Sequence, residues 1–185
     1  PSPRRIVLLA PAHRFAFEGL ALHPAIKWRT PLGEVPTLRD LSTLIPEARV
    51  LPEAFYNEHA IELPLVVLQA LLPEPFEIAP VLVGNCSTDL VCSVLQKLWG
   101  GPETVIAISS DLSHFLDLKA CEGRDRATAA RIETLQGSTL TGQDACGFRA
   151  VAGAIEVAAS HDMRVTTLQL THSAAAGGDP QRVVG

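Results

Sequence analysis

The sequence predicts an α/β protein: a single domain whose central, mostly parallel or mixed sheet is flanked by helices. Short apolar runs rich in β-branched residues or leucine alternate along the chain with longer segments of helical period. The length of 185 residues suits one domain with a sizeable core. A hydrophobic content of 47% and a mean hydropathy of +0.22 fit much buried strand.

The elements follow in order along the chain. Apolar runs predict strands at residues 5–10, 76–83, 104–109 and 164–171, with a further short candidate at 25–28. Helical period predicts helices at residues 37–45, 57–72, 88–99, 118–136 and 142–160. Pro64 limits where the second helix can begin, and Gly100-Gly101-Pro102 ends the third. Residues 173–179, rich in Ala and Gly, are expected to form a mobile loop.

Composition excludes several classes of function. The net charge is −5 and the basic residues are scattered, so we expect no nucleic-acid partner. No apolar run reaches about 18 residues and no signal peptide is visible, which predicts no membrane association. The four cysteines form no CxxC pair, which favours a reducing, cytoplasmic compartment. The chain starts without Met directly before a strand, so an upstream segment is expected to be missing.

The segment at residues 109–114, SSDLSH, follows a predicted buried strand and brings an acid and a histidine together. Sites in open α/β sheets form at the carboxyl ends of strands. Asp111 beside His114 would fix the imidazole tautomer and raise its basicity, as acid/base catalysis requires. The alternative, equally weighted on sequence alone, is that Asp111 caps a turn.

Three further positions are candidates for chemistry. His13 follows the first predicted strand, which suits a ligand, although a histidine bonded to a turn is the commoner case. His59 and Glu62 are three residues apart and would share a helix face, but an acidic first helical turn explains them as well. Cys146 at a predicted helix start could be a nucleophile or a metal ligand, whereas most lone cysteines are simply buried.

Short motifs give the chain a family resemblance when taken in order. They are PAHR at 11–14 with FEG at 17–19, TPLG at 30–33, EHAIE at 58–62, PVLVG at 80–84, SSD at 109–111 with His114, and ACG at 145–147. With these motifs the chain resembles the Memo family, whose bacterial branch is called AmmeMemoRadiSam system protein B. The resemblance runs from about residue 6 to the end, so residues 1–185 are interpreted as one Memo-like domain lacking its N-terminal segment.

The resemblance implies a fold and a site. The family is similar in fold to class III extradiol ring-cleavage dioxygenases, in which two histidines and a carboxylate hold Fe(II). It implies that His13 is a metal ligand, that His114 is the acid/base residue with Asp111 beside it, and that Cys146 replaces the carboxylate ligand. A second metal-binding histidine of the family lies in an upstream Pro-His-Ala-Gly-Tyr motif, so the ligand set of this chain is expected to be incomplete. The family also has two more residues between Glu62 and Leu63-Pro64.

Three functions are therefore compared. The first is a metal-dependent oxidoreductase acting on an unidentified small molecule or peptide, with Fe(II) expected and zinc or copper as alternatives, because a thiolate softens the ligand set. The second is a non-enzymatic metal- or ligand-binding module that acts with a radical-SAM protein partner, as the family name suggests. The third is a nucleophilic enzyme that pairs Cys146 with His114 or His13. Convergence of His13, His114 and Cys146 on one cleft is the spatial prediction.

Overall fold

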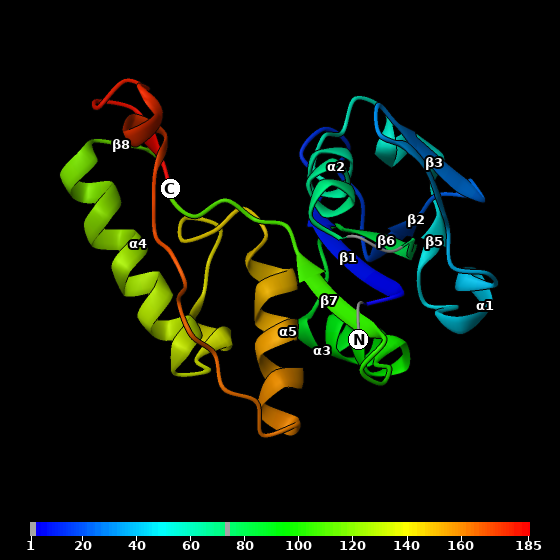
Figure 1. Ribbon diagram of the computed structural model, residues 1–185. Helices are drawn as coiled ribbons and strands as arrows, with labels where there is room; N and C mark the ends of the chain where they lie inside the picture. Colours follow the sequence, from blue (N-terminus) through cyan, green and yellow to red (C-terminus); the bar gives the residue numbers. More distant parts are fainter. Residues whose placement is uncertain (1–2, 73–74) are drawn as a thin grey trace. The chain divides into compact units, whose positions relative to one another are not determined.

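The computed structural model describes residues 3–72 and 75–185 (Figure 1). Residues 1–2 and 73–74 lie outside the described residues. The chain forms two compact units, residues 1–109 and 110–185. Each unit contains some of the candidate site residues that the sequence predicts.

The first unit is built on a five-stranded sheet with the strand order β5-β2-β6-β1-β7. The central strand β1 (Arg5–Pro11) runs parallel to β6 (Glu77–Val83) and to β7 (Thr104–Ile108). β2 (Leu20–Leu22) is antiparallel to β6, and β5 (Arg49–Val50) pairs parallel to β2. The sheet is therefore mixed, and the predicted α/β class is confirmed.

The other elements of this unit lie around the sheet (Figure 1). They are the hairpin β3 (Lys27–Thr30) and β4 (Gly33–Pro36), α1 (Leu41–Leu44), the 3-10 helix η1 (Pro52–Phe55), α2 (Glu62–Leu71) and α3 (Thr88–Leu98). Pro64 falls in the first turn of α2, where its missing N–H costs no hydrogen bond. Ser87 caps α3 by accepting a hydrogen bond from the N–H of Leu90.

The core of the first unit follows from strand alternation. Ile6 and Leu8 on β1 and Ile78 and Leu82 on β6 belong to one buried cluster, which Leu65 of α2 joins. Because successive side chains in a strand point to opposite faces, the intervening buried residues of β1 face the other side of the sheet. Burial on both faces explains why these strands are continuous apolar runs in the sequence.

The second unit is mostly helical. Its elements are β8 (His114–Leu116), α4 (Leu118–Glu133), the 3-10 helix η2 (Gly137–Thr139), α5 (Phe148–Ser160), the 3-10 helix η3 (Ser173–Ala176) and β9 (Val183–Val184). Asp117 caps α4 by accepting a hydrogen bond from the N–H of Ala120. β8 and β9 pair antiparallel, so the last residues of the chain lie beside His114.

The strands predicted at residues 5–10, 76–83 and 104–109 and the helices predicted at 88–99 and 118–136 are confirmed within one to three residues at each end. The strand predicted at 164–171 is wrong: this segment is irregular and mostly exposed, and Leu168 is 96% exposed. Its β-branched residues favour a strand, but within the described chain it pairs with no other strand, and a strand needs one for its backbone hydrogen bonds.

Four other expectations need adjustment. The helices predicted at 37–45, 57–72 and 142–160 form only from Leu41, Glu62 and Phe148 onward. Thr37 instead bridges to Ile78 of β6. Part of the loop predicted at 173–179 forms η3. Over the described ranges, no helix combines the length and apolar character that crossing a membrane requires.

Candidate functional site

His13 lies two residues beyond the carboxyl end of β1, in a loop that is fixed to the end of β6. The N–H of Gly84 donates to the carbonyl of Gly19 at 3.0 Å, and the N–H of Asn85 donates to the carbonyl of Phe17 at 2.9 Å. A Cβ at Gly84 would collide with the carbonyl oxygen of Phe17, so the close approach of the two segments requires glycine there. The PVLVG motif therefore positions the loop that carries His13.

Glu58 holds His13 in place. One carboxylate oxygen accepts the backbone N–H of His13 at 2.6 Å, and the other lies 3.0 Å from Nδ1 of the same residue. The second oxygen also accepts the N–H groups of His59 and Ala60 at 3.0 and 3.1 Å. Since a carboxylate only accepts hydrogen bonds, Nδ1 of His13 is the donor, and in the neutral imidazole this leaves the lone pair on Nε2.

The Glu58 side chain is 1% exposed. Burial on its own would raise the pKa of this carboxyl, but the hydrogen bonds from His13 and Ala60 outweigh burial and hold the pKa below its ordinary value. Glu58 is therefore an anion that orients histidine. Its lone pairs are already used by four N–H groups, so it fits a supporting role better than a metal-ligand role.

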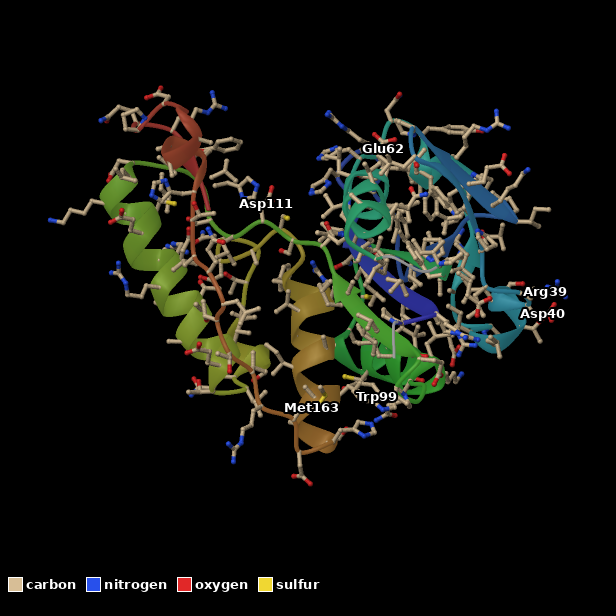
Figure 2. All side chains as sticks on the ribbon, viewed as in Figure 1. Arg39, Asp40, Glu62, Trp99, Asp111 and Met163 are labelled. Carbon is tan, nitrogen blue, oxygen red and sulfur yellow. The ribbon has the colours of Figure 1, made fainter. Side chains whose placement is uncertain are left out.

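His59 stacks on His13, with the ring centroids 5.3 Å apart and the planes 9° from parallel. The sequence paired His59 with Glu62, and Glu62 lies exposed at the first residue of α2 (Figure 2). The acid that the structure brings to both histidines is Glu58, which sequence reasoning missed. The available signal was its position directly before His59, but its bond to His13 spans 45 residues of sequence.

In the second unit, Asp111, His114 and Cys146 form a group. Each offers one ligand atom, and these atoms all lie within 4.8 Å of one another. Nε2 of His114 is 3.7 Å from a carboxylate oxygen of Asp111, and Nδ1 lies 2.9 Å from the carbonyl oxygen of Leu112. Because that carbonyl can only accept, Nδ1 is the donor and the lone pair of Nε2 faces the group. Asp111 precedes a strand rather than capping a helix, and its side chain is exposed (Figure 2).

Cys146 lies two residues before α5, which begins at Phe148. Its Sγ accepts the backbone N–H of Asp111 at 3.2 Å and lies 3.7 Å from the hydroxyl oxygen of Ser110. The N–H of Cys146 donates in turn to the carbonyl of Asp111 at 3.1 Å. The N–H of Gly147 donates to the Ser110 hydroxyl at 2.9 Å. These hydrogen bonds fix the position of the Cys146 sulfur beside Ser110 and Asp111.

A buried network fixes the segment that carries His114. Asp125 on α4 accepts the N–H of Ser113 at 3.0 Å and the thiol of Cys121 at 3.1 Å. The N–H of Leu112 donates to the carbonyl of Gly185, whose own N–H donates to Ser113, both at 2.9 Å. Burial raises the pKa of the Cys121 thiol, so this cysteine stays a neutral donor. The site is thereby held by both α4 and the end of the chain.

The structure thus brings together Asp111, His114 and Cys146 in one group, and His13, Glu58 and His59 in another. The sequence did not predict that His13 and His59 lie together. The convergence of His13 with His114 and Cys146 stays a prediction.

Comparison with known proteins decides the family. The model of the family described as "Memo-like protein" matches residues 1–185. The chain belongs to this family. A MEMO1 family protein of Thermoplasma acidophilum, Ta0237, is 27% identical over 197 residues, which cover 98% of this chain and 72% of the relative. A MEMO1 family protein of Aeropyrum pernix is 29% identical over 99% of this chain and 70% of its own length. TTHA0924 of Thermus thermophilus is 36% identical over 62% of this chain and 36% of its own length.

Proposed function

We propose that this Memo-like protein binds a divalent transition metal through the thiolate of Cys146 and moves protons with His114, as an oxidoreductase related to the extradiol dioxygenases. The supporting observation is the group of an imidazole, a carboxylate and a thiol within 4.8 Å. Asp111 and Cys146 are 35 residues apart in the sequence, so the fold assembles this group. Paired acid, base and soft ligand are the parts that metal-assisted proton abstraction needs.

The donor set fits a borderline-soft metal. Cys146 offers a sulfur whose position is fixed by a hydrogen bond from the backbone N–H of Asp111. The family resemblance adds His13 as a ligand, and the bond from Glu58 leaves its Nε2 able to act as one. Fe(II), with Zn(II) or copper as alternatives, suits such a set, and a bound metal would polarise a substrate oxygen and lower its pKa.

The proton step belongs to His114. Its Nδ1–H is held by the carbonyl of Leu112, so Nε2 is the atom that accepts a proton from a substrate hydroxyl. The Asp111 carboxylate, 3.7 Å away, stabilises the imidazolium that results. His114 returns the proton from the same nitrogen when the product leaves.

A second candidate has the same observation in its favour. A thiol and an imidazole nitrogen in one small group could instead form a Cys–His nucleophile, with His114 as the base for Cys146. The two functions predict different behaviour of Cys146. As a metal ligand it is shielded from alkylation when metal is bound, whereas as a nucleophile it forms a covalent intermediate with substrate.

All four cysteines are thiols, which suits a reducing compartment such as the cytoplasm.

The proposal is tested by an anaerobic titration with Co(II), in which binding is monitored through the thiolate-to-Co(II) charge-transfer absorption. We expect about one ion per chain, loss of the thiolate band in Cys146→Ser, and an unchanged band in the matched control Cys92→Ser. Cys92 lies on α3 in the first unit. Alkylation of Cys146 by iodoacetamide should slow when metal is added. A thiolate band that survives Cys146→Ser would contradict the assignment of Cys146 as the ligand. Alkylation of Cys146 at the same rate with and without metal would also contradict it, and would leave Cys146 free to act as the nucleophile.

A further inference from the structure

Phe115 has an unusual backbone conformation directly after His114. Its φ is +60°, in the left-handed region that bulky residues rarely adopt. The pairing of β8 with β9 shifts register at this point, between His114 and Leu116. The ring is 60% exposed, so burial of the side chain does not compensate for the strain. Strained residues of this kind cluster at sites where their orientation is used.

The Phe115 ring lies between a histidine and a cation. It meets the imidazole of His114 edge to face, with the centroids 5.5 Å apart and the planes at 76°. The guanidinium carbon of Arg182 lies 4.5 Å from the centroid of the same ring. Arg182 precedes β9 by one residue, so the pairing of β8 with β9 fixes both partners. The distance from the guanidinium carbon of Arg182 to the imidazole centroid of His114 is therefore at most the sum of their two distances to the Phe115 centroid.

Arg182 keeps its hydrogen-bonding capacity. Its guanidinium forms no ion pair with any described residue, whereas Arg124 and Arg131 in the same unit pair with Asp144. Contact with an aromatic face uses the plane of a guanidinium and leaves the N–H groups at its edges. Those groups match the two oxygens of a carboxylate.

We propose that Arg182, held on the Phe115 ring beside His114, binds the carboxylate of a small organic substrate whose reactive end lies at His114 and Cys146. The inference rests on the proposed function only for the identity of the reactive end. Phe115 acts as a positioning residue, because its left-handed backbone turns the ring to carry the guanidinium. The short span from guanidinium to imidazole selects a compact molecule with the acid group a few bonds from the reacting atoms.

Benzoate is a suitable probe, with benzamide as its neutral match and inorganic phosphate as the alternative anion. Titrations followed by NMR of the histidine ring protons, without metal, should show saturable binding of benzoate at His114 and much weaker binding of benzamide. Arg182→Gln should weaken benzoate binding about tenfold to a hundredfold. Arg182→Lys should be intermediate, because lysine keeps the charge without the planar fork. Added salt should weaken benzoate binding more than benzamide binding.

Arg126→Gln is the matched control, since Arg126 is an exposed arginine on α4 in the same unit. It should leave benzoate affinity unchanged. Equal affinity of wild type and Arg182→Gln for benzoate, absence of benzoate binding, or equal binding of benzamide would overturn the proposal. Phosphate binding tighter than benzoate binding would overturn the choice of a carboxylate. Co(II) binding should be the same in Arg182→Gln and wild type. The metal titration therefore tests the proposed function, and the benzoate titration tests the carboxylate site independently of it.

Discussion

Replacing Glu58 by Gln should destabilise the first unit substantially. The carboxylate accepts four hydrogen bonds at 2.6–3.1 Å, two of them from His13. The glutamine amide keeps one acceptor oxygen. Its NH2 group cannot accept hydrogen bonds, so the N–H donors that face it would lose their partner. Hydrogen bonds to a charged group contribute about 1.5–3 kcal/mol each, and an unsatisfied buried donor costs about 1–3 kcal/mol. Part of this loss relaxes through water, so we expect about 2–4 kcal/mol.

Urea unfolding followed by tryptophan fluorescence measures this effect, because both tryptophans, Trp28 and Trp99, lie in the first unit with Glu58. With an m-value of about 2 kcal/mol/M, the midpoint should fall by about 1–2 M. The matched control Glu62→Gln changes an exposed carboxylate at the start of α2 and should cost less than about 1 kcal/mol. Equal midpoints for the two variants would refute the role given to Glu58.

Three further predictions concern the second unit and the reaction. Asp144→Asn should cost about 1.5–3 kcal/mol at pH 7, the range for a hydrogen bond to a charged group. The hydrogen bond from Arg131 is the main cause that holds the pKa of the Asp144 carboxyl below its ordinary value. The stability difference between wild type and Asp144→Asn, measured by circular dichroism, should therefore persist at pH values above the ordinary carboxyl range. It should disappear as the pH falls through the lowered pKa. Iodoacetamide at pH 8, followed by peptide mass spectrometry, should modify Cys121 much more slowly than Cys146, because burial raises the pKa of the Cys121 thiol; equal rates would contradict this. Simple catechols should show little or no ring cleavage in an oxygen-electrode assay after anaerobic iron loading, because the Cys146 thiolate softens the ligand set and is itself oxidisable; robust turnover lost in His114→Ala would show the opposite.

The sequence could predict the elements whose local pattern and tertiary setting agree. β1 and β6 are apolar runs because they are buried on both faces of the sheet, whereas the edge strand β7 is only partly buried, and Val105 on it is 40% exposed. Residues 164–171 contain valine, leucine and threonine, which also favour a strand, but they are mostly exposed, since composition does not say whether a partner strand is present. The late start of α5 follows from the hydrogen bonds that hold Cys146 and Gly147 outside the helix.

The candidate site could be predicted only where each residue has a local signal. His13 and Asp111 follow strand ends, and the SSDLSH segment places His114 close by. Glu58 was missed because its role depends on a contact with His13 across 45 residues. Arg182 was missed for the same reason, since only the pairing of β8 with β9 brings it to Phe115.

X-ray absorption at the metal edge of the loaded protein tests the central claim most directly, because it counts sulfur ligands and measures their distance. For Zn(II) we expect one sulfur at about 2.3 Å together with nitrogen or oxygen ligands at about 2.0–2.2 Å. The sulfur shell should vanish in Cys146→Ser and remain in Cys92→Ser. A first shell of nitrogen and oxygen alone in the wild-type protein would contradict the account.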